Sequence, residues 1–219
     1  MVKIIIYTGL SISFDEARSI LDSFEDTEVI YKRPVKRGDL KEALKENPDI
    51  IAIIDGVFHQ NSAVGHREIL EVINKGIKVY GASSMGALRA SELDALGMTG
   101  VGYCYREYAS GRIESDDDVA VMLDRDTLEA LSTPLISMDY VFKKAVTQNI
   151  ISQSQKDELI KITKNTYYPK RSYSKTLNES GLDDATKDAL ADFIRTSGDI
   201  KKEDAVELLE KIKEDIHHL

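Results

Sequence analysis

The sequence has little cysteine and no long apolar run. Cys104 is the one cysteine among 219 residues, which excludes a disulfide framework and a cysteine-based zinc site. A single thiol is typical of proteins from a reducing compartment. No apolar segment approaches the ~20 residues of a membrane helix, and the short apolar start, residues 1–7, is not followed by a cleavage site. We therefore expect a cytoplasmic protein with no membrane partner.

An excess of basic residues is also absent. The chain has 29 Lys and Arg against 38 Asp and Glu, a formal net charge of −9. Surfaces that bind nucleic acid are basic, because Lys and Arg neutralise the phosphates. We therefore expect no nucleic-acid partner. Hydrophobic residues make up 42% of the chain, which is enough for a packed core rather than disorder.

Predicted strands and helices alternate through the first half of the chain. We expect strands at residues 2–7, 29–31, 49–56 and 77–80, with helices at 14–23, 39–46 and 64–74 between them. This alternation predicts an α/β fold with a parallel, doubly wound sheet and helices on both faces. Ligands of such sheets bind beyond the carboxyl ends of the strands. Three loops should meet there: residues 8–11, 56–62 and 82–86.

The pattern changes after residue 96. Three glycines at 97–102 indicate a turn, residues 103–110 a short helix and residues 119–123 a strand. Helical spacing follows at 138–148, 153–164, 172–179, 183–196 and 202–216. We therefore predict an α/β core domain over residues 1–135 and a helical C-terminal region over residues 136–219. The basic loop 32–38 and the acidic loop 114–118 are expected to be solvated.

Residues 77–93 contain the strongest catalytic candidate. A β-preferring run leads through small residues into a helix-forming segment, so a sharp strand-to-helix turn is expected. Residues 82–86, Ala-Ser-Ser-Met-Gly, fit the small-X-nucleophile-X-small pattern of a nucleophile elbow, with Ser84 as the nucleophile. Free N–H groups that begin the helix would lie beside its hydroxyl. The alternative is a tight loop in which Ser83 and Ser84 cap the helix.

A second signal follows the most apolar strand. Asp55, Gly56 and His59 come directly after it, which places His59 at the same sheet edge as Ser84. His59 or His66 could act as general base, with Asp55 to orient the imidazole. The alternatives are an ordinary loop histidine at 59 and a solvated helix histidine at 66. Together Asp55, His59 and His66 also suggest zinc, but their spacing matches no compact zinc motif, so we expect no metal.

The remaining candidates surround the turn and would bind substrate. Arg89 could hold an anion, or it could pair with Glu92 or Glu107 on the surface. A phosphate or nucleotide site at the turn is a further alternative. The turn lacks the lysine of a phosphate-binding loop and the glycine spacing of a dinucleotide site, so we expect no cofactor. The substrate-binding candidates are Ser83, Gly86, Arg89, Gly56, His66 and Thr8.

Residues 167–175 mix tyrosines with basic side chains. Nucleic-acid contact is one interpretation of such a mixture. The interpretation we favour is a loop-to-helix junction that packs its tyrosines. The acidic run 116–118 allows a similar choice between a bound cation and a solvated loop, and a charge run is usually solvated.

Four segments in register resemble the TfuA-like family. They are residues 55–60, 81–93, 97–102 and 116–120, and both their order and their spacing match. The resemblance covers roughly residues 48–125, with a weaker match near residue 168. The Ser-Met-Gly-Ala piece, residues 84–87, also resembles the nucleophile turn of Clp-type serine peptidases, but the rest of the chain does not follow that family.

The TfuA-like resemblance implies a role in peptide-backbone thioamidation. Proteins of this family work with YcaO enzymes, which activate a backbone amide with ATP. The resemblance implies that the chain releases sulfide from the C-terminal thiocarboxylate of a ubiquitin-like sulfur carrier such as ThiS, and that it activates YcaO allosterically. The products would be the thioglycine of methyl-coenzyme M reductase or a thioamidated natural product. Since the chain has no fused YcaO domain, it would act in trans.

Residues and resemblance together suggest one mechanism. Ser84 attacks the thiocarboxylate carbon, His59 takes the proton, and N–H groups at the turn stabilise the oxyanion. A route in which a histidine activates water directly stays open. A non-catalytic adaptor that only docks on YcaO and an anion-binding α/β module are the other classes of function. A homo-oligomer is compatible with all of them.

Overall fold

The computed structural model describes residues 1–21, 26–58, 62–122 and 130–217. The chain forms two compact units. We call residues 1–114 and 200–219 the sheet unit, and residues 115–199 the helical unit. The last helix, α10 (Ile200–His217), therefore belongs to the sheet unit although it follows the helical unit in sequence. The domain division after residue 135 stays a prediction.

The sheet unit is built on five parallel strands in the order β2-β1-β3-β4-β5. The register places Ile5 of β1 between Ile30 of β2 and Ile51 of β3. From β1 the polypeptide continues to β2 on one side, and from β3 it continues to β4 and β5 on the other side. A topological switch point therefore lies between β1 and β3. The predicted parallel, doubly wound sheet is confirmed. The strands are β1 (Val2–Tyr7), β2 (Thr27–Lys32), β3 (Ile50–Ile53), β4 (Lys78–Gly81) and β5 (Met98–Gly100).

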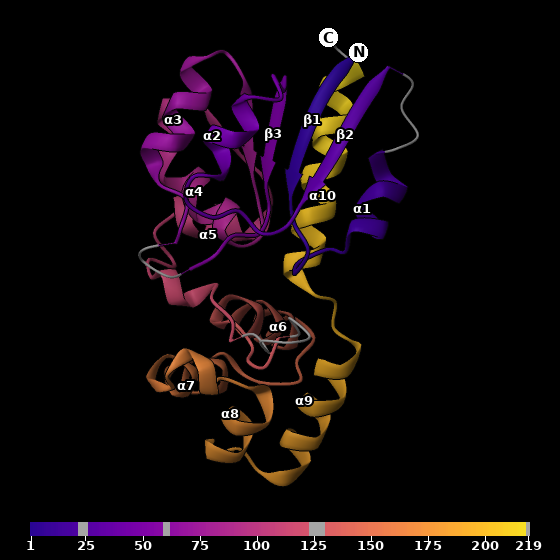
Figure 1. The fold of residues 1–219 in the computed structure, drawn as a ribbon. Coiled ribbons are helices and arrows are strands. Elements are labelled where there is room, and N and C mark those ends of the chain that lie inside the picture. The colour runs from indigo at the N-terminus through magenta and orange to yellow at the C-terminus, as the bar shows by residue number, and fades with distance from the viewer. Residues whose placement is uncertain (22–25, 59–61, 123–129, 218–219) are drawn as a thin grey trace. The chain divides into compact units, whose positions relative to one another are not determined.

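Helices cover both faces of this sheet (Figure 1). On one face α1 (Phe14–Leu21) and α10 pack against alternate strand residues, including Ile4 and Ile50. On the other lie α2 (Asp39–Leu44), α3 (His66–Asn74) and α4 (Met85–Leu93). Neighbouring residues of a strand point to opposite faces, which explains why the strands are apolar throughout. Each fully buried aliphatic side chain contributes roughly 1.5–3 kcal/mol.

Asp204 ties α10 to the sheet unit. Its carboxylate, which is 1% exposed, accepts hydrogen bonds from the N–H groups of Tyr103 (2.6 Å) and Cys104 (2.7 Å). Both N–H groups belong to the first turn of α5 (Gly102–Ala109), where a carboxylate also complements the helix dipole. Gly102 has φ +91°, and a Cβ there would lie 2.6 Å from Asp204 Oδ1. Burial raises the pKa of the Asp204 carboxyl.

The helical unit has its own core. Its helices are α6 (Leu135–Thr147), α7 (Gln153–Asn165), α8 (Tyr173–Glu179) and α9 (Asp184–Thr196), close to the predicted ranges. Apolar residues of all four helices form one buried cluster: Met138, Phe142, Leu159, Leu177 and Leu190. Among the helices that the structure describes, none combines the length and apolar character needed to cross a bilayer.

Two sequence predictions between residues 97 and 123 are wrong. Residues 98–100 form the edge strand β5, where the glycines had suggested only a turn. Three residues carry too little local preference to indicate a strand, and it is pairing with β4 that extends them. Conversely, residues 119–122, the described part of the predicted strand 119–123, form no strand. Val119 and Ala120 are instead buried in irregular structure, which the apolar pattern alone cannot distinguish from a strand.

Candidate functional site

The segment between β4 and α4 makes a sharp turn at the carboxyl edge of the sheet. Ser83 has φ +67°, in the left-handed region that non-glycine residues rarely occupy. Ser84 has φ −108° and ψ −117°, which is also sparsely populated. Each such conformation costs of the order of 1–3 kcal/mol and persists only where the surrounding structure holds it. Backbone strain of this kind is concentrated at functional sites, so it supports the elbow interpretation.

Helix α4 approaches the sheet too closely for side chains at two glycines. A Cβ on Gly86 would overlap the carbonyl oxygen of Ile53, and a Cβ on Gly81 would overlap the carbonyl oxygen of Gly86. At Gly56, a Cβ would lie 2.7 Å from Met85 Cγ. These contacts explain why small residues flank the turn. They give Gly86 and Gly56 packing roles, and contact of either residue with substrate stays a prediction.

The hydroxyl of Ser84 does not cap α4. Its backbone occupies the N-cap position, but its side chain accepts no hydrogen bond from the helix. The Ser84 N–H donates to Ala82 O (2.9 Å) and Ile54 O (3.4 Å), and the Gly86 N–H donates to Ile54 O (3.3 Å). For the Met85 N–H, no acceptor is found among the described residues. The capping alternative therefore fails for Ser84, and within the described part of the chain the N–H directly after the candidate nucleophile is without an acceptor.

The hydroxyl of Ser83 belongs to a buried chain of hydrogen bonds. It donates to Ser11 Oγ (2.7 Å), and Ser11 Oγ donates to Asp55 Oδ1 (2.6 Å). Asp55 Oδ2 accepts the N–H groups of Leu10 (2.9 Å) and Ser11 (2.8 Å), and it lies 3.4 Å from the Thr8 hydroxyl. Asp55, Ser83 and Thr8 are fully buried. This chain of hydrogen bonds joins the loops after β1, β3 and β4 at the switch point. It confirms that loops 8–11 and 82–86 meet.

Asp55 therefore organises the loop after β1. Its role in orienting a histidine stays a prediction, because His59 lies outside the described residues. The predicted general base at His59 stays a prediction for the same reason. Thr8 is a loop anchor, since its hydroxyl also donates to Ile12 O (3.0 Å).

His66 and Arg89 belong to a charged cluster on α3 and α4. His66 Nε2 lies 2.7 Å from Glu92 Oε2, and Arg89 Nη1 lies 2.6 Å from the same oxygen. Arg89 Nε donates to Val64 O (3.1 Å), and the residue is only 9% exposed. Of the two alternatives for Arg89, the structure shows the pairing with Glu92, although the arginine is buried rather than on the surface. An anion would have to compete with Glu92 for this guanidinium.

A metal centre has no support in the described part of the chain. No group of three or more His, Cys, Asp and Glu side chains there is arranged to hold an ion. Of the three candidate ligands, Asp55 accepts hydrogen bonds from the loop after β1, and His66 pairs with Glu92. His59 is not among the described residues.

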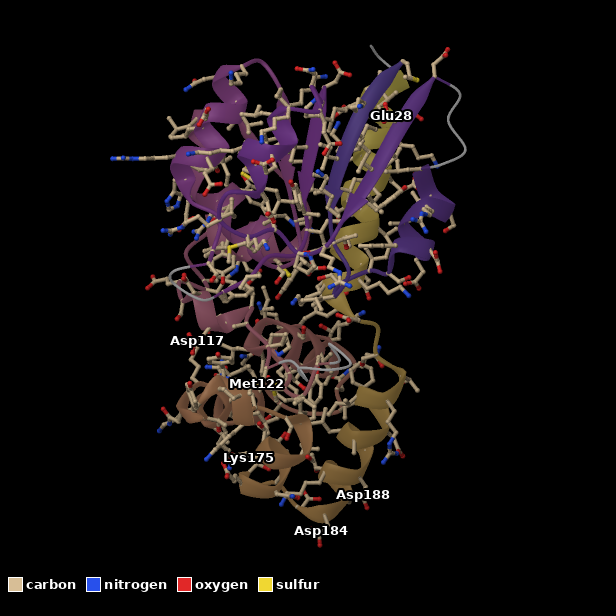
Figure 2. All side chains as sticks on the ribbon, viewed as in Figure 1. Glu28, Asp117, Met122, Lys175, Asp184 and Asp188 are labelled. Carbon is tan, nitrogen blue, oxygen red and sulfur yellow. The ribbon has the colours of Figure 1, made fainter. Side chains whose placement is uncertain are left out.

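In the helical unit, the basic and aromatic segment is partly packed. Arg171 is 3% exposed, and its Nε donates to the carbonyls of Thr163 (3.2 Å) and Thr166 (3.0 Å). Its other nitrogens bind the carbonyl (2.6 Å) and carboxylate (3.2 Å) of Asp117, which Figure 2 labels. The buried residue of this segment is thus an arginine, whereas the prediction was a junction that packs its tyrosines, and Asp117 of the acidic run is bound by this arginine. Tyr167, by contrast, is 67% exposed.

A groove of about 660 Å³ lies between α8 and α9 of the helical unit. Figure 2 shows two of its acidic residues, Asp184 and Asp188, along α9. Tyr173, Leu177 and Lys187 also line it. None of the candidate residues that the structure describes is among those lining this groove.

Two structurally important polar residues were not predicted from the sequence. Ser11 lies in a loop that was expected at the site, but nothing in its neighbours indicates that it would join Ser83 to Asp55. Asp204 lies 100 residues from the Cys104 N–H that it accepts. A buried aspartate on an apolar helix face is the available signal, since such a residue needs a hydrogen-bond donor.

Comparison with known proteins identifies the family. A search of curated proteins finds no match. A family model described as TfuA-like protein matches residues 55–172, which is more than half of the 219 residues. The matched segment begins at Asp55 and includes the whole serine turn. The chain therefore belongs to the TfuA-like family, which is associated with YcaO-dependent thioamidation of peptide backbones.

Proposed function

We propose that this protein releases sulfide from the C-terminal thiocarboxylate of a ThiS-like sulfur carrier, and that a YcaO enzyme uses this sulfide for thioamidation. One observation carries the proposal. The Ser84 hydroxyl makes no capping hydrogen bond and lies in a strained turn at the carboxyl edge of the sheet, and the Met85 N–H directly after it has no acceptor among the described residues. Nucleophile and oxyanion donor are combined in this way in a nucleophile elbow.

The reaction proceeds in two steps. Ser84 Oγ attacks the carbonyl carbon of the carrier's thioacid, His59 takes the hydroxyl proton, and the Met85 N–H stabilises the oxyanion. The C–S bond then breaks, and sulfur leaves as hydrosulfide (HS⁻) with the proton that His59 returns. Water hydrolyses the resulting serine ester, which restores Ser84 and leaves the carrier with an ordinary carboxylate. No electron transfer is needed.

The buried hydrogen-bond chain positions the nucleophile. Ser83 has a left-handed backbone conformation, and its hydroxyl donates a hydrogen bond to Ser11. Ser11 in turn donates a hydrogen bond to Asp55. This arrangement offsets the strain at the residue before Ser84. Asp55 thus acts on the serine turn through Ser11.

The same geometry disfavours an anion or nucleotide site. Helix N-termini bind phosphate through several free N–H groups. At this turn the N–H groups of Ala82, Ser84 and Gly86 already donate to backbone carbonyls, which leaves those of Ser83 and Met85 without an acceptor among the described residues. Two N–H groups suit a single oxyanion better than a phosphate.

A non-catalytic adaptor is the second candidate, and the enclosure of Ser84 favours it. Ser84 is 2% exposed, so a carrier tail has to displace part of its surroundings to reach the hydroxyl. An adaptor would need only a surface that docks on YcaO and stimulates it. It would act equally well with sulfide from any source.

Sulfide release by the isolated protein tests the proposal. With a thiocarboxylated carrier and no YcaO, Ser84→Ala should lower the rate by at least about 10³-fold. Ser91→Ala is the matched control, because it removes a hydroxyl from the same helix where that hydroxyl only bonds Leu88 O. Ser84→Ala should still stimulate YcaO that is supplied with inorganic sulfide. A wild-type protein that stimulates YcaO but releases no sulfide would establish the adaptor instead.

A further inference from the structure

Residues 32–38, the last residue of β2 and the loop after it, run along the carboxyl edge of the sheet toward α2 (Figure 1). Val35 at its centre forms a parallel bridge with Gly56, and the Val35 N–H donates to Asp55 O (2.9 Å). Gly56 in turn packs against the side chain of Met85, the first residue of α4. A continuous set of contacts thus connects this loop with the turn that carries Ser84.

The loop concentrates positive charge in an acidic unit. Residues 32–38 include four basic residues and no acidic one, whereas the sheet unit has 18 basic and 23 acidic residues. Lys32 pairs with Glu46. The side chains of Arg33 and Lys36 are exposed, and neither makes an ion pair within the described part of the chain. The nearest acid in sequence, Asp39, accepts the Lys36 backbone N–H at 3.0 Å.

Hydrogen bonds hold the loop backbone in place beyond Val35. The Arg37 N–H donates to Ser62 O (2.7 Å), and the Gly38 N–H donates to Glu68 Oε2 (2.7 Å). Arg33 and Lys36 therefore project from an ordered backbone. A partner that binds them pays little to order the loop, and preorganisation of this kind favours association.

We propose that Arg33 and Lys36 form a docking surface for an acidic face on the folded body of the sulfur carrier. The inference rests on the proposed function, since it names a surface that presents the carrier to Ser84. The thiocarboxylate itself carries one negative charge, and it has to lie at the serine turn in order to react. The two exposed cations at the same sheet edge are therefore available to the folded part of the carrier, to which the tail is attached. Complementary charge at such a surface accelerates encounter and orients the partner.

Charge reversal at these positions tests the docking surface. The double variant Arg33→Glu with Lys36→Glu should raise KM for the thiocarboxylated carrier about tenfold or more at low ionic strength, with kcat within about twofold. Salt at about 0.5 M should remove most of the difference, because it screens exposed charges. Lys75→Glu is the matched control, because this exposed lysine ends α3 at the opposite edge of the sheet. It should leave KM within about twofold of the wild type.

A further measurement shows whether a change in KM comes from the tail of the carrier or from its folded body. A synthetic peptide thiocarboxylate with the sequence of the carrier tail should show the same KM in wild type and double variant. An equal rise in KM for this peptide would mean that the cations bind the tail, which overturns the proposal. So would an unchanged KM for the whole carrier.

Direct calorimetric titration with the unmodified carrier distinguishes failure of the docking surface from failure of the proposed function. Affinity should fall about tenfold in the double variant even if the wild-type protein releases no sulfide. Equal affinities for wild type and double variant would overturn the docking surface whatever the outcome of the sulfide assay.

Discussion

The hydroxyl of Ser83 donates a hydrogen bond of 2.7 Å to the hydroxyl of Ser11, 72 positions earlier in the chain. Ser11 passes the interaction to Asp55, so the loop after β1 is bonded to the turn after β4. Ser83 has a left-handed backbone, and this bond fixes it at the residue before Ser84. The geometry of the candidate nucleophile therefore depends on Ser11, a serine with no chemical role of its own in the proposed reaction.

Removal of the Ser11 hydroxyl should destabilise the protein. Ser11→Ala leaves Ser83 Oγ and Asp55 Oδ1 buried and without this partner, which should lower the free energy of unfolding by about 1–3 kcal/mol. Urea denaturation measures the change. Ser19→Ala, which removes an exposed hydroxyl from α1, should stay within about 0.5 kcal/mol of the wild type. Equal stabilities of the two variants would show that the buried chain contributes nothing.

Gly86 should tolerate no side chain. Gly86→Ala places a Cβ inside the carbonyl oxygen of Ile53, so α4 must move away from the sheet. We expect a loss of at least about 3 kcal/mol in unfolding free energy, or an insoluble protein. Gly65→Ala is the control, because its Cβ would find its nearest neighbour at 3.8 Å with an ordinary φ of −89°. A Gly86→Ala protein as stable as Gly65→Ala contradicts the close packing of α4.

Asp204 should make folding pH-dependent. Burial raises the pKa of its carboxyl above the ordinary 3.8, whereas in the unfolded chain it titrates near that value. Between the two values the folded state binds more protons than the unfolded state, so stability falls as pH rises. The unfolding free energy of wild type minus that of Asp204→Asn should therefore decrease as pH is raised above about 4. A difference that increases over this range would show that hydrogen bonds outweigh burial.

Arg171 should stabilise the helical unit. Arg171→Ala removes the donor to the Thr163 and Thr166 carbonyls and the partner of Asp117. We expect an unfolding free energy lower by about 3 kcal/mol, because hydrogen bonds of a buried charge are strong. Lys170→Ala changes the exposed neighbour and should have an effect within about 0.5 kcal/mol. Denaturation followed by a probe in the helical unit checks both. Similar losses in the two variants would contradict a specific role for Arg171.

Local signals in the sequence were sufficient to predict the serine turn and the sheet. The strand, the small residues and the helix around Ser84 are contiguous, and each has its own preference. The capping box at the start of α1 is a local signal of the same kind, since Ser13 and Glu16 are three residues apart.

Interactions between distant residues could not be predicted in this way. The Ser11 hydroxyl gains its role only when three loops meet, and β5 becomes a strand only because β4 lies beside it. Helix α10 has the apolar spacing of the helices before it. Its return to the sheet unit brings its apolar face against the strands and Asp204 against α5, and the apolar spacing does not indicate which unit the helix joins.

The central claim is that Ser84 forms an ester with the carrier tail, and intact-protein mass measurement tests it most directly. The protein is mixed with thiocarboxylated carrier and quenched in acid at short times. The account predicts a covalent species with the summed mass of the two proteins less one hydrogen sulfide, located on the peptide that contains Ser84 and absent from Ser84→Ala. Sulfide release at the wild-type rate by Ser84→Ala, with no such species in either protein, would contradict it.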